Sequence, residues 1–336
     1  MRRTSICLHV VASICLLVIA AFHLVAAAQA PVARGLSLAW SLDGRWTGVA
    51  SDEESGAIYS LPRDRVAEVD LAGQIRREFE LSAVDGLTLR LGKFPRPTLL
   101  TFSVWGSRAV HAIDIEGNRL WSYPALTGID AITAADVDED GSDEVVVGYN
   151  GSSGVHVLDG KGQQRWKSTA SGNVWQVAVG DVLGQGRPQV VTSAFAKVQV
   201  FGADGKERVD VAVPRAFINM VRVGRLRPED STDTMLVAGN DLASKANVVI
   251  ALSTDGTSTW RLELPGSVHT AQVASARPWL ALGTRDGQVY VVDAVRGEIL
   301  GVVDAQGGAE VGWVGTPPLL LVATGTSLNA FHVTAK

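Results

Sequence analysis

Short runs of β-branched and apolar residues alternate along this chain with Gly, Asn, Asp and Ser, the pattern of short strands joined by tight turns. One stretch shows the pattern most clearly, with runs at 129–136, 144–149, 155–159 and 163–168. No stretch after residue 30 has the 3.6-residue apolar period of an amphipathic helix. The pattern therefore predicts an all-β chain assembled from four-stranded units.

A short phrase recurs along the chain: two β-formers, Asp or Ser, two spacers, Gly, and often Trp four residues after the Gly. Its clearest copies are VHAIDIEGNRLW at Val110–Trp121, VHVLDGKGQQRW at Val155–Trp166 and VIALSTDGTSTW at Val249–Trp260. The reference glycines, spaced 41 to 51 residues apart, are Gly73, Gly117, Gly162, Gly205, Gly256 and Gly297. A period of about 40–50 residues with several short strands per repeat is typical of a β-propeller. The repeated Trp121, Trp166 and Trp260 are predicted to pack between neighbouring blades.

The number of blades follows from the third strand of each repeat. These strands are expected to begin at or near Val66, Val110, Val155, Val198, Val248, Val289 and Leu328. The last repeat ends at Lys336 with no room for a fourth strand, whereas residues 35–40 supply a spare strand at the other end of the chain. An open ring would leave an unpaired edge. We therefore predict a seven-bladed propeller of four-stranded antiparallel blades, closed by the N-terminal strand. Eight blades are the alternative, if residues 35–50 form a fuller blade.

Residues 1–28 differ from the rest of the chain. Arg2 and Arg3 precede an almost continuous apolar run over 6–25, and small residues follow at 26–28. This order is that of a signal peptide cleaved after Ala28, which leaves 29–336 as a single propeller domain in the periplasm or outside the cell. An uncleaved membrane anchor is the alternative, because the apolar run is nearly long enough to span a bilayer.

The two cysteines and the charge exclude several classes of function. Cys7 and Cys15 both lie in the signal segment, so the mature chain has no disulfide, thiol nucleophile or cysteine metal site. The formal charge of the whole chain is −5, and removal of two arginines makes the mature chain more acidic. A mildly acidic exported protein is a poor nucleic-acid binder. We expect a monomer that meets a membrane only through an uncleaved N-terminal segment.

The D-x-x-G-x-x-x-W ending of the phrase, seen best at 110–121 and 155–166, resembles the repeat of the pyrroloquinoline-quinone-type propeller superfamily. That superfamily includes quinone-dependent dehydrogenases and non-catalytic scaffolds. The dehydrogenases are far longer and use a vicinal disulfide over the cofactor, which this chain lacks the cysteines to form. The resemblance therefore implies a non-catalytic member without bound pyrroloquinoline quinone.

A second resemblance is local. The segment from Asp136 to Gly148 is similar to the calcium loop of FG-GAP-type propeller repeats. Ca²⁺ binds six to eight oxygens, and Gly141 allows the sharp turn that such a loop needs. The predicted ligands of one structural calcium are Asp136, Asp138, Asp140, the Ser142 carbonyl and Glu144, while Asp143 is expected to point outward. A solvated acidic turn is the alternative.

Alignment of the innermost strands places one column of polar and aromatic residues at the mouth of the central channel. The column reads Asp130, Trp175, Asn219, His269 and Glu310, with Arg45 and Asp85 at or near it in the first two repeats. These residues would suit a polar ligand such as a sugar, stacked on Trp175. Alternatively, Asp130, Asn219, His269 and Glu310 would hold a divalent cation for hydrolysis. Simple polarity beside a water-filled channel is the third interpretation.

The sequence thus predicts an exported β-propeller that binds or scaffolds an envelope or extracellular protein, or a glycan, and carries one structural calcium. The alternative is a metal-dependent hydrolase or lyase at the channel mouth. No nucleophile elbow, phosphate loop or metalloprotease motif occurs in the sequence, so we favour a protein that is not an enzyme.

Overall fold

The computed structural model describes residues 33–62, 65–81, 88–102, 109–125, 127–213 and 216–334. Within it, Pro31–Lys336 forms one compact unit. The predicted signal peptide lies outside the described residues. No helix in the described ranges is long and apolar enough to cross a membrane.

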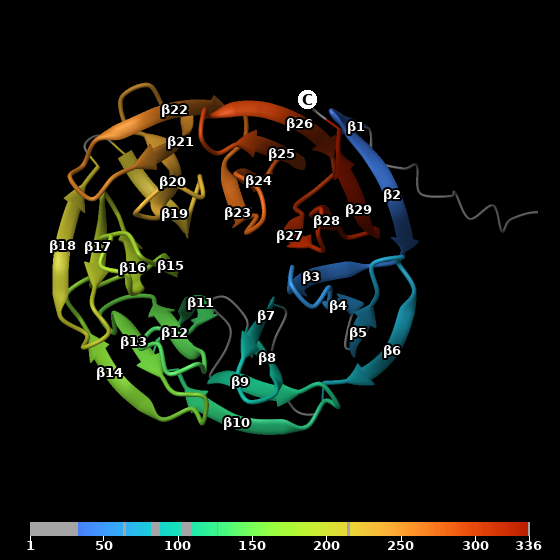
Figure 1. The fold of residues 1–336 in the computed structure, drawn as a ribbon, viewed down its shortest axis with the longest axis horizontal. Coiled ribbons are helices and arrows are strands. Elements are labelled where there is room, and N and C mark those ends of the chain that lie inside the picture. Colours follow the sequence, from blue (N-terminus) through green and yellow to red (C-terminus); the bar gives the residue numbers. More distant parts are fainter. Residues whose placement is uncertain are drawn as a thin grey trace, which may run out of the picture. The chain divides into compact units, whose positions relative to one another are not determined.

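Seven four-stranded antiparallel blades surround a common axis (Figure 1), and the prediction of a seven-bladed β-propeller is confirmed. The innermost strands are β3 (Trp46–Ser51), β7 (Thr88–Lys93), β11 (Ile129–Ala135), β15 (Gln176–Gly180), β19 (Ala216–Gly224), β23 (Val268–Val273) and β27 (Glu310–Val314). Each contacts the innermost strand of the next blade, and β27 contacts β3, so the ring is closed. The second strands are β4 (Ile58–Pro62), β8 (Pro97–Phe102), β12 (Glu144–Tyr149), β16 (Gln189–Ala194), β20 (Thr234–Asp241), β24 (Trp279–Thr284) and β28 (Leu319–Ala323).

The two outer layers follow the recurring phrase. The third strands are β5 (Arg65–Val69), β9 (Ala109–Asp114), β13 (Val155–Leu158), β17 (Lys197–Phe201), β21 (Asn247–Leu252), β25 (Gln288–Asp293) and β29 (Ser327–Val333). The outermost strands are β2 (Leu36–Asp43), β6 (Ile75–Glu80), β10 (Arg119–Pro124), β14 (Gln164–Ser168), β18 (Glu207–Ala212), β22 (Ser258–Leu264) and β26 (Glu298–Asp304). Seven third strands thus occur where the phrase predicted them.

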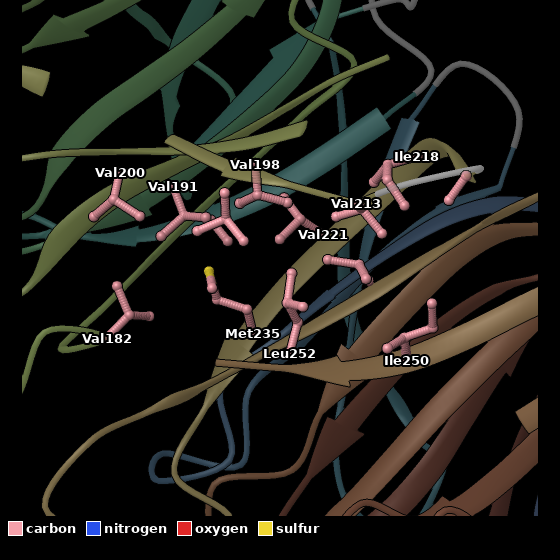
Figure 2. Close-up of a cluster of buried hydrophobic side chains, with 14 of the residues drawn as sticks. Val182, Val191, Val198, Val200, Val213, Ile218, Val221, Met235, Ile250 and Leu252 are labelled. Carbon is pink, nitrogen blue, oxygen red and sulfur yellow. The ribbon is translucent and has the colours of Figure 1, made fainter. Parts of the chain in front are cut away.

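Burial explains the apolar runs of the middle strands. Every residue of β12, β13 and β16 is buried, because both faces of these strands pack against neighbouring blades. The outermost strands β6 and β10 instead alternate exposed with half-buried residues. Figure 2 shows one interblade core, in which Val191 and Val198 of the fourth blade face Met235 and Leu252 of the fifth. The core is therefore a series of such layers around the ring.

The N-terminal segment closes the ring as predicted. Strand β2 pairs antiparallel with β29, with Ser37 opposite His332 and Leu42 opposite Leu328, and supplies the outer strand of the seventh blade. A short strand that the sequence did not predict, β1 (Ala33–Arg34), pairs with the outer strand β26 of the sixth blade. One continuous segment therefore joins the sixth and seventh blades (Figure 1).

The recurrence of the glycine and the tryptophan of the phrase along the chain reflects a contact between successive blades. A Cβ on Gly162 would lie 2.7 Å from the indole of Trp121 in the preceding blade, and the indole Nε1 of Trp121 donates to the Gly160 carbonyl at 3.0 Å. The same tryptophan-on-glycine packing occurs in the pairs Trp40–Gly73, Trp166–Gly205 and Trp260–Gly297. The prediction that the repeated tryptophans pack between blades is confirmed, and each tryptophan packs on the glycine of the next copy.

Candidate functional site

The innermost strands all run in the same direction along the central channel, so its two mouths can be named by the ends of these strands. We call the mouth where these strands begin the N-side mouth and the mouth where they end the C-side mouth. The innermost strands of all seven blades surround the axis (Figure 1), so residues far apart in sequence lie near each mouth.

The predicted column lies at the N-side mouth. Asp130, Asn219 and His269 each occupy the position where the register of the innermost strand shifts by one residue. A β-bulge of this kind re-aims the side chain of the extra residue. Glu310 is the first residue of β27, and Trp175 directly precedes β15. Arg45 precedes β3 and is exposed, whereas Asp85 lies outside the described residues.

The three bulge residues carry polar atoms that have no hydrogen-bond partner in the described structure. These buried atoms are Asp130 Oδ1, Asn219 Oδ1 and His269 Nδ1. The side chain of Asp130 also accepts one bond from Asn150 Nδ2, at 3.3 Å. Buried polar groups without partners are rare and are found where water or a ligand completes the site.

Burial controls the charge of these groups. Desolvation raises the pKa of Asp130 to about 6, and the hydrogen bond from Asn150 opposes this shift. Desolvation also lowers the pKa of His269, against the attraction of Glu310 on the next blade. The His269 imidazole is therefore neutral at neutral pH, and Glu310 is held by the Thr270 hydroxyl, which donates to it at 3.2 Å.

Asp130→Asn is expected to stabilise the protein at neutral pH. A carboxyl whose pKa is raised on folding carries no penalty below its unfolded pKa, and it destabilises the fold as the pH rises through the folded value. For Asp130, which is 6% exposed, the penalty develops as the pH rises from 3.8 to about 6 and is complete above about pH 6. The pKa is raised from 3.8 to about 6, and one pKa unit corresponds to about 1.4 kcal/mol, so we expect the variant to gain up to about 3 kcal/mol at pH 8 and little at pH 4. Urea unfolding of both proteins at the two pH values measures this, and an equal gain at both would contradict it.

Trp175 is half-buried and packs against other aromatic rings. Its ring contacts Phe217 edge-on, with centroids 5.4 Å apart. Phe217 in turn meets Phe195, whose side chain is 58% exposed on a backbone of positive φ. The three rings form an aromatic cluster between the fourth and fifth blades.

The acidic loop joins β11 to β12 and is a tight turn. Asp136 accepts hydrogen bonds from the backbone N–H groups of Asp140 at 3.1 Å and Gly141 at 2.9 Å. Glu144 accepts from the Val137 N–H at 2.9 Å. One oxygen each of Asp136, Asp138 and Glu144 lie within 4.8 Å of one another. The structure therefore brings three of the predicted ligands together, whereas Asp140 accepts from the Ser142 N–H within the turn.

A positive side chain that the sequence analysis did not consider reaches this loop. The guanidinium of Arg165, on the outermost strand β14, contacts Asp138 Oδ2 and Glu144 Oε1, at 2.5 and 3.0 Å. Burial raises the pKa of Glu144, and Arg165 opposes that shift. The loop's acidic charge is thus partly compensated by the protein itself.

The equivalent loop of the fourth blade forms the same turn with fewer acidic residues. Asp181 accepts from the N–H groups of Gln185 and Gly186, at 2.9 and 2.8 Å, and Gln189 accepts from the Leu183 N–H. This loop has the same capping pattern without the other acids. The carboxylates of Asp138 and Glu144 are therefore additional to what the turn needs.

A large cavity lies at the C-side mouth, at the other end of the channel from the predicted column. Its volume is about 550 Å³, and side chains from five blades line it. Its charged residues are Asp52, Glu53, Glu54, Lys93, Asp136 and Asp143. Ser275 and Trp313 of the sixth and seventh blades form the opposite wall. The cavity thus combines five carboxylates with one ammonium group.

The acidic residues of this cavity are fixed by contacts that cross between blades. Glu53 accepts from the Ser275 N–H at 2.8 Å, and its other oxygen is buried without a partner in the described structure. Asp143 accepts from the Lys93 N–H at 2.6 Å, so it faces the neighbouring blade, and the expectation that it points outward is wrong. Desolvation raises the pKa of Asp143, and Asp136 and Asp52 add to the shift. Asp143 thus shares this cavity with carboxylates that are near enough to repel its charge.

A second cavity of about 500 Å³ adjoins the first between the first two blades. The two share Asp52, Glu54, Leu91 and Lys93. The second is more apolar, and its wall includes Tyr59, Phe94 and Pro97. Together they form one groove, which we call the C-side groove, that runs from an acidic channel mouth to an apolar cleft.

The sequence analysis missed the C-side groove because it followed the beginnings of the innermost strands. A signal was present: Asp52, Glu53 and Glu54 directly follow β3, as Asp136 follows β11. Comparison with known proteins adds no further site, since no family model and no curated protein matches the chain.

Proposed function

We propose that this propeller is a protein-binding module whose C-side groove receives a basic segment of a partner. The observation that carries the proposal is the cavity of about 550 Å³ lined by five carboxylates and one lysine. A lysine or arginine of the partner would enter the acidic mouth, and a neighbouring apolar side chain would contact Phe94 and Tyr59. Charge complementarity of this kind gives specificity and fast association.

Binding fits the geometry better than metal-dependent hydrolysis. Hydrolysis at the N-side mouth needs Asp130, His269 and Glu310 to present their ligand atoms to one ion. Among the described residues, the group that brings three such atoms within 4.8 Å is the acidic loop and does not include these three. The unpartnered atoms of the N-side column instead suit hydrogen bonds to water or to a polar ligand such as a glycan.

A structural calcium ion at the acidic loop is part of the proposal. Asp136, Asp138 and Glu144 would supply carboxylates, with Asp140 and the Ser142 carbonyl completing the set. The donor set suits a cation, since Asp138 Oδ1 is buried without a hydrogen-bond partner in the described structure. Bound calcium would share Asp138 and Glu144 with Arg165 or displace its guanidinium.

Calcium is expected to raise the thermal midpoint of the wild-type protein by about 5 °C over the value in EDTA. A ligand at 100 times its Kd stabilises the folded state by about 2.7 kcal/mol, and about 1 kcal/mol shifts the midpoint of a domain this large by about 2 °C. Asp138→Ala should lose the shift, whereas Asp181→Ala, in the equivalent loop of the fourth blade, should retain it. Equal midpoints with calcium and with EDTA would remove the ion from the proposal.

The last part of the proposal is that the protein is exported. Cleavage after Ala28 would release a chain that begins at Gln29 in the periplasm or outside the cell. The partner is then an envelope or extracellular protein. Sequencing the N-terminus of protein from its native host checks the cleavage, and an intact Met1 would favour a membrane anchor.

The binding proposal is tested with a labelled peptide that alternates lysine and leucine. Fluorescence anisotropy at low salt should show binding that is about tenfold weaker in the double variant Glu53→Gln/Asp143→Asn. These changes keep oxygen acceptors for the N–H groups of Ser275 and Lys93 and remove two charges. The same variant should fail to capture the partner that wild type retains from the native envelope.

A matched control distinguishes the effect of charges in the C-side groove from the effect of the protein's net charge. Glu116→Gln/Glu263→Gln also removes two charges, from side chains that are about 60% exposed and lie outside the cavity. Peptide binding that falls equally in both double variants would reject the C-side groove. Capture of glycan, with no peptide binding, would favour the N-side column.

A further inference from the structure

Two arginines line a small cavity in the central channel, next to the cavity of the C-side mouth, with which it shares Gln272. Arg90 on β7 and Arg222 on β19 line a space of about 130 Å³ together with Thr133, Gln272 and residues 177–179 of β15. These residues lie on the innermost strands of five of the seven blades, so the space lies on the path of the channel.

Neutral groups hold the Arg222 guanidinium in place. Its Nε donates to the Ala271 carbonyl at 2.6 Å, and its Nη1 donates to Gln176 Oε1 at 2.9 Å and to the Val221 carbonyl at 2.7 Å. Its Nη2 has no hydrogen-bond acceptor among the described residues. Several donors therefore remain for another group.

Arg90 makes fewer hydrogen bonds than Arg222. Its Nη1 donates to the Leu89 carbonyl at 2.7 Å, and this is its one hydrogen bond in the described structure. Neither Arg90 nor Arg222 has a carboxylate within ion-pair distance in the part of the chain described. Both arginines nevertheless lie inside the propeller, where charge is poorly screened.

The positive charge of Arg90 disfavours the charged form of Arg222. Burial and, to a smaller extent, the positive charge of Arg90 lower the pKa of Arg222 to about 9, and the negative charge of Glu310 opposes these effects. Two like charges in one cavity are costly unless an anion neutralises them.

Exposed arginines of the same chain show the opposite arrangement. Arg165, Arg261 and Arg296 each contact two carboxylates at the surface. The partly buried pair in the channel has none, although ion pairing is worth more there than in water. The unpaired arginines are thus those that most need an anion.

We propose that Arg90 and Arg222 form a binding site for a small oxyanion, a phosphate or a carboxylate, in the central channel. A guanidinium presents its N–H donors in a planar fork that matches two oxygens of such a group. The hydroxyl of Thr133 and the amide of Gln272 line the same space and add neutral donors. The cavity holds roughly four waters by volume, which suits one ion of this size.

Titration calorimetry with inorganic phosphate, at constant ionic strength, tests the site. We expect wild type to bind phosphate and the Kd to rise at least about tenfold in Arg90→Gln and in Arg222→Gln, because each change removes charge-assisted hydrogen bonds to the anion. Arg187→Gln, which removes an exposed arginine from the loop before β16, should leave the Kd unchanged. Circular dichroism confirms that each variant is folded.

Selenate-soaked crystals provide a readout that does not depend on a variant. An anomalous peak between Arg90 and Arg222 supports the site. Absence of both the peak and phosphate binding overturns it, as does a Kd that is the same in wild type and both channel variants.

The source of the oxyanion is tested separately with the basic peptide described above. A peptide with a free C-terminal carboxylate is compared with its C-terminal amide. If only the free form loses affinity in Arg222→Gln, the anion is a partner's carboxyl terminus. If the two forms behave alike while phosphate binds, the anion is a free ion. This outcome is independent of whether Glu53→Gln/Asp143→Asn weakens the peptide.

Discussion

A chain that lacks residues 1–43 is expected to lose the folded propeller, whereas a chain that begins at Ala33 is expected to keep it. The deletion removes β2 from the edge of β29 and β1 from the edge of β26. Leu328 and Phe331 of β29 are fully buried, and they would lose cover from Leu36 and Leu42 of β2. Lost pairing and lost burial together should exceed about 5 kcal/mol, the lower end of typical protein stability.

Thermal circular dichroism and size-exclusion chromatography measure the effect. The deleted chain should lack a cooperative transition and should associate, because an exposed strand edge pairs with other chains. A synthetic peptide covering residues 33–43, added during refolding, should restore a monomeric ring by strand addition. A deleted chain with an unchanged melting transition would show that closure contributes little to stability.

Gly162→Val is expected to destabilise the propeller by about 4 kcal/mol. Gly162 has a φ of +77°, and a left-handed conformation costs an L-residue about 1–2 kcal/mol. Its Cβ would also lie 2.7 Å from the Trp121 ring, and overpacking of this kind costs about 1–3 kcal/mol more. Urea unfolding monitored by tryptophan fluorescence gives the difference in the free energy of unfolding.

Gly151→Val is the matched control. Gly151 has a φ of +79°, but a Cβ there would meet no atom within 4 Å. It should therefore show the conformational cost alone, about 2 kcal/mol. If the two variants are equally destabilised, the tryptophan-on-glycine contact does not limit the packing of successive blades.

The recurring phrase has a complete structural explanation in the third and outermost strands. Its aspartate caps the turn: Asp159 accepts from the N–H groups of Lys161 at 2.9 Å and Gln163 at 2.8 Å. Its glycine adopts positive φ, and its tryptophan packs on the next blade. The groups proposed to bind ligands lie instead where the repeats differ, on the innermost strands and the loops that follow them.

The column of residues at the N-side mouth shows which features of a site can be predicted by aligning the repeats. Asp130, Asn219 and His269 were aligned from the sequence, and all three occupy equivalent β-bulges. The sequence did not show that each would carry a buried atom without a partner, because that depends on neighbours from other blades. Alignment therefore located the positions, and packing decided their chemistry.

Sequence alone determined the number of blades, their order and the closing strand. These follow from local rules, namely strand propensity, turn residues and a fixed repeat length, and each repeat obeys them independently. Only the tertiary structure decided which polar and charged groups lie close to one another. Glu53 and Ser275 are 222 residues apart, and Arg90 and Arg222 lie on the second and fifth blades. Such pairs come together only when the ring closes, since no local pattern encodes a distance across the channel.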